Sequence, residues 1–518
     1  MKARQDMQSN VLEYFETGAR LSNPDKVALV DGDSRYTFSQ LERHAKNFAA
    51  AILARTQALN RPVAVFLPKC AQTVFADLGI VYSGNCYANL DVKSPPERLK
   101  AILGNLGAEL VVTHAQLAPL LANAGVPAER LLLVDTVAGD APRWDQAALD
   151  ARLAQVIDTD PLCIIHTSGS TGVPKGVALN HRSTIDFMDW AFDRLGLGGE
   201  ETIGSLSPLY FDIYTLELWL SLAKGATLVL LQEQLAAFPA KLLSYLAQES
   251  VSFIFWVPTV MVNIANQGLL EKIPQPALRK VLFAGEVFPT KPLNHWRRQL
   301  PQAMFVNLYG PIEITVDCTY FIVDRDMADD EKLPIGFPCR NTDVLIVNED
   351  NRPAQVNEHG ELCVRGSSLA LGYWNNPERT AQAFVQNPLH SHYPELVYRT
   401  GDLVYRNERG EIMFVGRKDY QIKHQGYRIE LGEIEHAALQ VPGIRHACVV
   451  YDAPNKDIVL YFESEQDIGA AEIRRELGLR VPKYMLPTLI ERVEHMPRNP
   501  NGKIDRLALS AGHARHGA

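Results

Sequence analysis

Short apolar runs alternate with longer amphipathic segments along the first three quarters of the chain. The runs are almost continuously apolar, which is typical of strands buried on both faces of a parallel sheet that helices cover. They lie at Pro62–Pro68, Glu109–Thr113, Leu131–Asp135, Leu162–Ile165, Thr227–Leu231, Phe253–Val257 and Val281–Ala284. This pattern predicts a large α/β core built from mostly parallel sheets.

The apolar pattern changes near Gly336. Val344–Val347, Leu362–Val364 and Ile412–Val415 are shorter runs, separated by turns rich in Asn, Asp and Gly. Such spacing predicts antiparallel strands in a small barrel-like region that belongs to the core.

A third pattern begins after Gly416, where charged helices alternate with two apolar strands. In chain order these elements are expected at Glu430–Ala438, His446–Tyr451, Ile458–Glu463 and Ala471–Gly478. We therefore divide the chain into a large N-terminal core, residues 1–416, and a small C-terminal α+β domain, residues 417–518.

Composition and charge exclude several classes of protein. The chain has 518 residues, with 51 Lys and Arg against 60 Asp and Glu, and its formal net charge is −9. That balance argues against a general nucleic-acid-binding protein. No apolar run reaches the roughly 18 residues of a membrane span, and the first residues lack the apolar segment of a secretory signal. The seven cysteines lie far apart, as expected for reduced thiols, so we expect a cytoplasmic protein that binds neither nucleic acid nor membrane.

The segment with the clearest chemistry is a loop rich in Gly, Ser and Thr at residues 166–176. It directly follows the predicted strand Leu162–Ile165, and Lys175 adds a positive charge. Small residues let successive backbone N–H groups point toward an anion, and hydroxyl groups add donors. The loop is not a Walker loop, because Lys175 precedes Gly176, and it lacks the glycine pattern of a nucleophile elbow. It predicts a phosphate site of another kind.

This loop resembles the signature of acyl-adenylate-forming enzymes, particularly the adenylation domains of nonribosomal peptide synthesis. Other segments match motifs of that family in the same order along the chain. They are Tyr36–Leu41, Asn307–Glu313, Gly360–Gly366, Tyr398–Leu403, Gly416–Asp419, Gly426–Glu430 and Asn501–Arg506. The resemblance covers nearly the whole chain and implies the fold of that family, with ATP and Mg²⁺ as cofactors.

The resemblance also implies the first reaction and the residues that carry it. A substrate carboxylate attacks the α-phosphate of ATP and releases pyrophosphate, which depends on positioning and charge neutralisation. Glu313 would bind Mg²⁺, Arg417 would lie near the ribose, and Lys503 would be the catalytic lysine between the substrate carboxylate and the forming phosphoester. The positions implied for ATP and AMP are Thr167, Ser168, Gly169, Ser170, Thr171, Gly172, Lys175, Gly285, Glu286, Asn307, Tyr309, Gly310, Asp402 and Phe414.

The second reaction needs a thiol, which the chain itself does not offer in an activating motif. In this family the small domain rotates about a hinge, here Asp419, and turns another face toward a phosphopantetheine arm. That face is implied at Lys423 and Gly426. No convincing carrier or condensation motif is present, so we expect a monomeric, free-standing ligase that forms a carbon–sulfur bond with a separate peptidyl carrier protein.

The stretch Leu209–Glu217 carries the choice of substrate. Asp212 offers a carboxylate to an α-ammonium group, with a helix N-cap as the alternative interpretation. The family pattern places these residues around the substrate side chain: Ile213, Leu216, Phe255, Leu282, Ala284, Leu308, Val316 and Asp317. Their mostly apolar character excludes a charged side chain and is similar to the pocket of prolyl-activating enzymes of pyrrole biosynthesis. We expect L-proline.

Three positions depart from the family pattern. Asp317 is an acid where a small residue is usual, and it either points away from the pocket or reads a hydroxyl on a modified substrate. Ile312 replaces a threonine, which removes one phosphate contact. Gln425 stands where a basic residue is common.

Rival interpretations share the fold but differ in substrate. Another small apolar amino acid, such as valine or a substituted proline, would use the same machinery, and a D-alanyl–carrier ligase would want a smaller pocket. An acyl-CoA synthetase would use coenzyme A, and Asp212 counts against it. A binding module without catalysis would have lost Lys503, Glu313 or Asp402, all of which are present.

Overall fold

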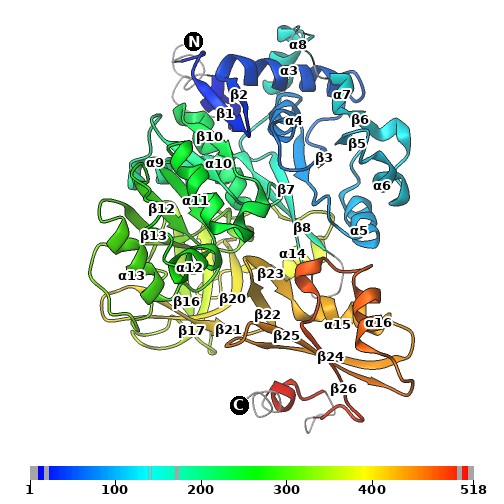
Figure 1. Ribbon diagram of the computed structural model, residues 1–518, viewed down its shortest axis with the longest axis vertical. Helices are drawn as coiled ribbons and strands as arrows, with labels where there is room; N and C mark the ends of the chain where they lie inside the picture. Colours follow the sequence, from blue (N-terminus) through cyan, green and yellow to red (C-terminus); the bar gives the residue numbers. More distant parts are fainter. Residues whose placement is uncertain are drawn as a thin grey trace.

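The computed structural model describes residues 10–16, 23–137, 139, 141, 143–169, 174–498 and 504–510. Within these ranges the core consists of alternating layers of helices and sheets, and the C-terminal region lies against one end of it (Figure 1). The mixed α/β architecture predicted from the apolar pattern is confirmed.

The largest sheet runs in the order β15-β14-β13-β12-β11-β9-β10-β1-β2. Its inner strands are parallel, whereas β2, β14 and β15 are antiparallel to their neighbours. The strands are β1 (Val27–Asp31), β2 (Ser34–Thr37), β9 (Thr202–Ser205), β10 (Thr227–Leu230), β11 (Phe253–Trp256), β12 (Lys280–Phe283), β13 (Met304–Tyr309), β14 (Thr319–Ile322) and β15 (Phe337–Pro338).

The second sheet of the core runs in the order β18-β8-β7-β4-β3-β5-β6. It is parallel except at β8 and β18. The strands are β3 (Pro62–Phe66), β4 (Cys86–Asn89), β5 (Leu110–Thr113), β6 (Leu131–Leu133), β7 (Pro161–Thr167), β8 (Lys175–Asn180) and β18 (Gly372–Tyr373). The prediction of a strand through Asp135 is wrong at its end, because Val134–Val137 forms the short helix α7.

Both faces of each sheet are covered by helices, which explains the continuous apolar runs. In β11, Phe253 and Phe255 face one apolar cluster, whereas Ile254 and Trp256 face another. The helices between the two sheets are α3 (Phe38–Leu53), α4 (Ala71–Tyr82), α9 (His181–Leu195) and α10 (Asp212–Lys224). Those on the outer faces are α5 (Pro96–Leu106), α6 (Ala118–Asn123), α11 (Pro239–Gln248), α12 (Pro258–Asn266) and α13 (Thr290–Gln299).

Helix α10 is buried along almost its whole length, since every residue from Ile213 to Ala223 is buried. A helix that is apolar on all sides needs neighbours on all sides, and α10 finds them between the two sheets. It ends at Gly225, whose φ of 72° forms a left-handed cap. The buried helix holds its first residue, Asp212, in a fixed place.

A third, antiparallel sheet follows in the chain, as the shorter apolar runs predicted. Its strands are β16 (Thr342–Val347), β17 (Gly360–Gly366), β19 (Phe384–Gln386), β20 (Leu396–Arg406) and β21 (Ile412–Arg417). The short helix α14 (Pro377–Ala383) precedes β19.

The C-terminal region forms its own small α+β unit around a separate apolar cluster. Its elements are β22 (Gln421–His424), β23 (Tyr427–Glu430), α15 (Leu431–Leu439), β24 (Ile444–Asp452), β25 (Asp457–Ser464), α16 (Ala470–Leu477) and β26 (Leu489–Arg492). All four predicted elements occur within one or two residues of their expected ends. The boundary at residues 416 and 417 stays a prediction.

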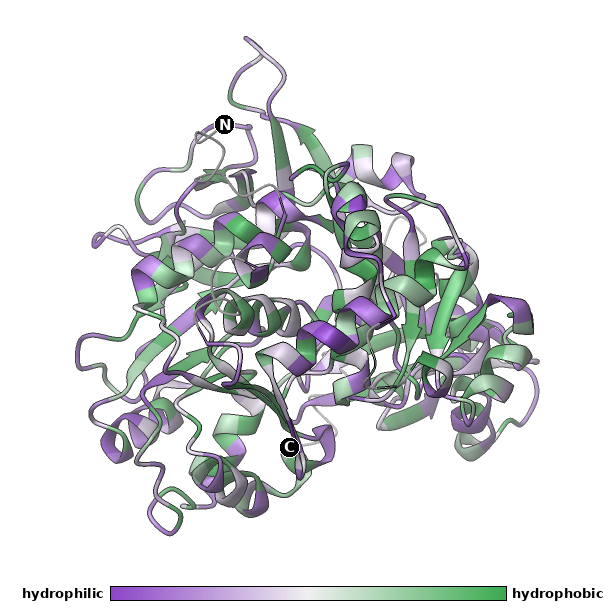
Figure 2. Ribbon diagram, turned by 90° about the horizontal axis from the view of Figure 1, so that it is seen from above, coloured by the Kyte–Doolittle hydropathy of each residue, from purple (hydrophilic) through white to green (hydrophobic). Residues whose placement is uncertain are grey.

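Polar residues gather on the loops and the outer helix faces, and apolar residues fill the layers between them (Figure 2). No helix in the described ranges is both long enough and apolar enough to cross a membrane.

Candidate active site

The predicted amino-acid pocket lies where β11, β12 and β13 end beside the start of α10. Ligands of α/β sheets commonly bind at the carboxyl ends of the parallel strands. The apolar positions predicted for this pocket belong to one cluster, and none is more than 6% exposed: Ile213, Leu216, Phe255, Leu282, Ala284, Leu308 and Val316. The fold therefore brings these side chains together, and their contact with a substrate stays a prediction.

Asp212 is the first residue of α10, and the N-cap is the preceding residue, Phe211, which makes no side-chain capping bond. Asp212 Oδ1 accepts a hydrogen bond from Ile213 N at 2.9 Å. By surface area Asp212 is only partly buried, but protein surrounds its carboxyl group, and this loss of hydration raises its pKa to about 6. Such a carboxylate beside an apolar wall can pair with an ammonium group.

A strained loop carries a second carboxyl group, that of Asp317. The two residues before it, Thr315 and Val316, have φ angles of 55° and 65°, a conformation that β-branched residues rarely adopt. Asp317 is 1% exposed, and its Oδ2 has no hydrogen-bond partner among the described residues. Burial and the charge of Asp212 raise the pKa of Asp317 well above its ordinary value, against the opposing charge of Lys423.

The glycine-rich loop leaves the core at the end of β7 and returns to it at β8. Thr167, Ser168, Gly169 and Lys175 lie at its two ends, whereas Ser170, Thr171 and Gly172 are outside the described residues. The Thr167 hydroxyl has no partner in the described part of the chain. Burial, together with the nearby Arg428 guanidinium, lowers the pKa of Lys175 to about 8.

Glu313 lies at the centre of a buried charged cluster. Its Oε1 accepts a hydrogen bond from the Tyr373 hydroxyl at 2.9 Å and lies 3.4 Å from Lys175 Nζ. Its Oε2 accepts a hydrogen bond from Arg428 Nη1 at 2.8 Å. Burial alone would raise the pKa of Glu313, but Arg428 and Lys175 outweigh it and hold the pKa well below its ordinary value. Glu313 is therefore ionised.

An ionised carboxylate next to a lysine suits the Mg²⁺ and the ATP phosphates that the resemblance implies. Oxygen ligands suit Mg²⁺, which also binds substrate phosphates, and Lys175 offers charge to those phosphates. Arg428 occupies Glu313 Oε2 in this arrangement. The residues fit ATP with Mg²⁺ once Arg428 is withdrawn from Glu313.

Three residues predicted to contact the nucleoside are bonded to one another. Asp402 accepts hydrogen bonds from the Tyr309 hydroxyl and from Arg417 Nη1, the latter at 2.7 Å. The Phe414 ring centroid lies 6.4 Å from that of Tyr309. The Asn307 side chain bonds elsewhere: its Nδ2 donates a hydrogen bond to the Pro334 carbonyl at 2.7 Å.

The C-terminal region contacts the glycine-rich loop through several hydrogen bonds. Gly169 N donates to Glu433 Oε2 at 3.1 Å, and Ser168 Oγ donates to the Arg428 carbonyl at 2.7 Å. Glu433 also forms a buried ion pair with Arg98 of α5. The Glu433 carboxylate thus occupies a backbone N–H group that the resemblance assigns to phosphate.

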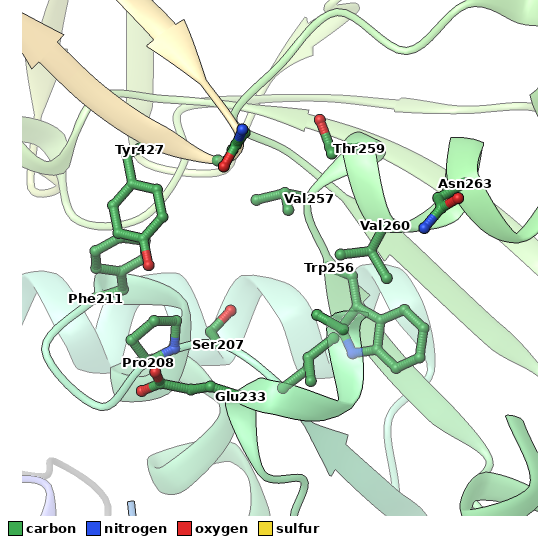
Figure 3. A pocket seen from close by; sticks show the side chains of 14 residues that line it. Ser207, Pro208, Phe211, Glu233, Trp256, Val257, Thr259, Val260, Asn263 and Tyr427 are labelled. Carbon is green, nitrogen blue, oxygen red and sulfur yellow. The ribbon is translucent and has the colours of Figure 1, made fainter. Parts of the chain in front are cut away.

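A channel of about 290 Å³ opens between the core and the turn of the β22–β23 hairpin (Figure 3). The Tyr427 ring lies edge-on to Phe211, with ring centroids 5.3 Å apart, on one side of the channel. The lining residues are Leu206, Ser207, Pro208, Phe211, Glu233, Ala236, Trp256, Val257, Thr259, Val260, Asn263, Gln425, Gly426 and Tyr427. The lining residue Trp256 faces the opposite side of β11 from Phe255, so the channel lies across this strand from the predicted wall of the amino-acid pocket, while Phe211 directly precedes Asp212.

The hairpin turn that closes this channel depends on a glycine. Gln425 and Gly426 have φ angles of 53° and 83°, as two-residue hairpin turns require. A Cβ at position 426 would approach the Val257 side chain to 3.0 Å. Gly426 N donates to Glu286 Oε1 at 2.8 Å, and Glu286 Oε2 accepts from Thr259 N at 3.0 Å. Glu286, which the resemblance implies for ATP, therefore joins the core to the hairpin here, next to Gly285 with its φ of 92°.

The predicted hinge residue lies between β21 and β22. Asp419 accepts two hydrogen bonds from Arg417, at 2.6 and 2.7 Å, and this cation holds the pKa of Asp419 below its ordinary value although burial raises it. Lys423 follows on β22, and its Nζ lies 5.9 Å from the centroid of the Tyr309 ring. Lys423 therefore reaches toward the core.

Lys503 lies outside the described residues. The nearest described residues on either side, Arg498 and Ile504, pair in an isolated antiparallel bridge. Ile504 packs on Cys448 and Val450, whereas Val449, between them, faces the cluster that contains α15. Ile504 is thus on the opposite side of the β24–β26 sheet from α15.

Sequence reasoning gave no role to several residues that meet at this site. Arg428 lies inside a quoted motif, and its position two residues after Gly426 was the available signal. Glu433, Arg98 and Tyr373 come from three distant segments, and no spacing in the sequence links them.

Comparison with known proteins identifies the family. The family model for AMP-binding enzymes matches residues 15–374. Tyrocidine synthase 1 of Brevibacillus parabrevis is 32% identical over 509 residues, which are 96% of this chain and 45% of that protein. The delta-poly-L-ornithine synthetase of Acinetobacter baumannii is 31% identical over 518 residues, 98% of this chain and 37% of that protein. The chain thus spans less than half the length of these curated relatives.

Solved structures share the fold along nearly the whole chain. An artificially fused adenylation–PCP di-domain from Klebsiella oxytoca has a TM-score of 0.81 at 21% identity, covering 94% of each chain. The Vibrio cholerae adenylation domain AlmE, in complex with glycyl-adenosine-5'-phosphate, has a TM-score of 0.83 at 22% identity, covering 98% of each chain. The chain has the fold of an adenylation domain and belongs to the family of AMP-binding enzymes.

Proposed function

We propose that this protein activates an α-amino acid as its aminoacyl-adenylate and transfers it to the phosphopantetheine thiol of a carrier protein. The observation that carries the proposal is Asp212, a carboxylate held at the start of the buried helix α10 beside an apolar pocket. A fixed carboxylate in such a place suits the α-ammonium group of an amino acid.

In the first step a carboxylate oxygen of the amino acid bonds to the α-phosphorus of ATP, and pyrophosphate leaves. Lys175 and the backbone of the glycine-rich loop neutralise phosphate charge. Glu313 would hold Mg²⁺, which would supply further charge neutralisation when bound. Asp402 accepts hydrogen bonds from the ribose hydroxyls. Asp212 keeps the ammonium in place, so that the carboxylate meets phosphorus in a fixed geometry.

The first step requires the C-terminal region to take a different position on the core. Arg428 donates a hydrogen bond to Glu313, and Glu433 accepts one from the N–H group of Gly169. The Glu313 carboxylate and the Gly169 N–H, which we assign to the nucleotide, are therefore already bonded within the protein. Rotation about Asp419 frees them and lets Lys503 approach the substrate carboxylate. A two-position domain of this kind serves two reactions in one site.

In the second step the thiol sulfur bonds to the carbonyl carbon of the adenylate, and AMP leaves. The channel beside the β22–β23 hairpin supports this step, because it is partly apolar and lies between the core and the hairpin, near the start of α10. A phosphopantetheine arm is long and thin enough for such a passage.

Among α-amino acids we propose L-proline. The wall is apolar and compact, since Phe255, Leu216 and Leu308 narrow it, and proline still offers two N–H donors to Asp212. ATP–pyrophosphate exchange across the twenty amino acids tests the assignment. Proline should give the highest rate of the twenty, and valine or leucine well above proline would refute it.

The acceptor is tested separately by incubating the enzyme and ATP with coenzyme A or with a holo-carrier protein. Thioester on the carrier alone is expected. Equal or faster thioester formation with coenzyme A would instead make the protein an acyl-CoA synthetase.

A further inference from the structure

The segment between β9 and α10 depends on side chains for its backbone hydrogen bonds. It runs from Ser205, the last residue of β9, to Asp212 at the start of α10, and the described residues between them form no helix or strand. Buried backbone carbonyls need hydrogen-bond partners, and an irregular segment has no ladder of its own to supply them. Here two side chains of the second sheet supply them.

The first of these side chains is Lys69, just after β3. Its Nζ donates hydrogen bonds to the Ser205 and Ser207 carbonyls, both at 2.7 Å. Lys69 is 7% exposed. Burial lowers its pKa to about 8, and the charge of Glu217 on α10 opposes that shift. A buried ammonium group with two such bonds fixes the end of β9 relative to the second sheet.

The second side chain is Asn89, the last residue of β4. Its Nδ2 donates hydrogen bonds to the Leu209 carbonyl at 3.1 Å and to Asp77 Oδ2 at 3.0 Å. The same Asp77 oxygen accepts a hydrogen bond from the Tyr214 hydroxyl at 2.9 Å. Leu209 precedes Asp212 in the chain and Tyr214 follows it, so this network restrains the backbone on both sides of the substrate-binding carboxylate.

The topology places both side chains at one edge of the second sheet. Strands β3 and β4 are parallel neighbours, and Lys69 and Asn89 lie at their carboxyl ends. Strand β9 belongs to the other sheet and also presents its carboxyl end, at Ser205. The hydrogen bonds therefore join two different sheets at the place where the amino-acid site begins.

We propose that Lys69 and Asn89 are positioning residues for amino-acid binding, which hold the segment leading to Asp212 so that its carboxylate meets the α-ammonium group. This inference rests on the proposed function, because it concerns the amino acid that Asp212 binds. Glu313 and Lys175, which we assign to Mg²⁺ and the ATP phosphates, belong to other segments. Binding of ATP should therefore not depend on the two positioning residues.

The first test separates the two substrates in ATP–pyrophosphate exchange, using the amino acid that gives the highest rate. Lys69→Met should raise the KM for the amino acid about 10- to 30-fold, because a displaced carboxylate pairs poorly with the ammonium group, and should leave the KM for ATP unchanged. Asn89→Ala removes one carbonyl partner and should raise the amino-acid KM about 3- to 10-fold.

The matched control is Lys46→Met, which removes another buried lysine. Lys46 Nζ donates hydrogen bonds to Glu42 and Gln146, at 2.7 and 2.9 Å, and both KM values should stay at the wild-type level. Lys69→Met leaves the buried Glu217 carboxyl group without its nearby positive charge. The pair Lys69→Met with Glu217→Gln therefore replaces the single variant if thermal unfolding shows that the latter does not fold.

A double-mutant cycle distinguishes positioning from general damage. If Lys69 acts through Asp212, Lys69→Met should add little to the amino-acid KM of Asp212→Ala, whereas independent effects would multiply. Multiplying effects would overturn the inference. So would an unchanged amino-acid KM in both Lys69→Met and Asn89→Ala, or KM values for ATP and amino acid that rise together. Absence of exchange with every amino acid in the wild-type enzyme would instead count against the proposed function itself.

Discussion

The amino-acid pocket takes all of its predicted wall residues from the core, whereas the channel is lined by residues of both the core and the C-terminal hairpin. The pocket residues are at most 6% exposed and belong to one cluster. The channel, in contrast, needs Gln425, Gly426 and Tyr427 of the hairpin against the core. The proposed domain rotation would therefore leave the pocket wall in place, but it would open the channel by removing the hairpin that closes it. Substrate choice and acceptor access should thus be separable by mutation.

The largest effect is expected from the predicted catalytic lysine, Lys503. Lys503→Ala should slow adenylate formation by about 10³-fold, because the charge that follows the reacting oxygens is lost. ATP–pyrophosphate exchange measures this effect. Transfer from a chemically prepared aminoacyl-adenylate to the carrier should be unchanged, since the channel is intact. Pyrophosphate release at the wild-type rate would contradict the role of Lys503.

Removing the carboxylate of the pocket should have the next largest effect. Asp212→Ala should raise the KM for the amino acid roughly 100-fold, because the α-ammonium loses its charged partner, while the KM for ATP changes little. The matched control is Asp467→Ala, since the Asp467 side chain is fully exposed and far along the chain. A parallel loss of affinity for ATP and amino acid would point to damaged folding instead.

Filling the channel should impair transfer to the carrier protein and leave adenylate formation unchanged. Val260→Trp should lower carrier loading by roughly 30-fold through a misplaced or excluded thiol, with ATP–pyrophosphate exchange unchanged. Val287→Trp is the control, because Val287 is 72% exposed and does not line the channel. Equal losses in exchange and loading would show that pocket and channel are not separable.

The smallest effect should be a dependence of substrate binding on pH. Burial raises the pKa of Asp212 to about 6; below that pH the carboxyl group is protonated and cannot pair with ammonium. The KM for the amino acid should therefore rise as the pH falls, by about 10-fold between pH 7 and pH 5. Steady-state kinetics at saturating ATP measures it. A KM that is flat across this range would remove Asp212 from the binding step.

Much of the fold was predictable because its signals are local. The apolar runs at Phe253–Val257 and Val281–Ala284 correspond to β11 and β12, since a strand covered on both faces must be continuously apolar. The run at Leu131–Asp135 was only partly predictable. Val134 is as apolar as a strand residue, but it begins helix α7, where tertiary packing decides the conformation.

Site residues were predictable from the sequence where they belong to a motif, and were not predictable where two distant segments meet. Glu313 and Lys175 were expected together, and they lie 3.4 Å apart. The ion pair of Arg98 with Glu433 joins residues 335 positions apart, and no periodicity encodes such a contact. The left-handed backbone at Thr315 and Val316 was equally hidden, because both residue types normally avoid it.

One glycine limits how this enzyme could be redesigned. A Cβ at Gly310 would lie 2.4 Å from the Asp317 Cα, so the two backbone segments already touch and neither can recede. The position of this loop is therefore fixed by main-chain contact rather than by any side chain. Any side chain at position 310 would push the loop that contains Thr315 and Val316 away from the end of β13, so Gly310 ties the left-handed conformation of that loop to this strand.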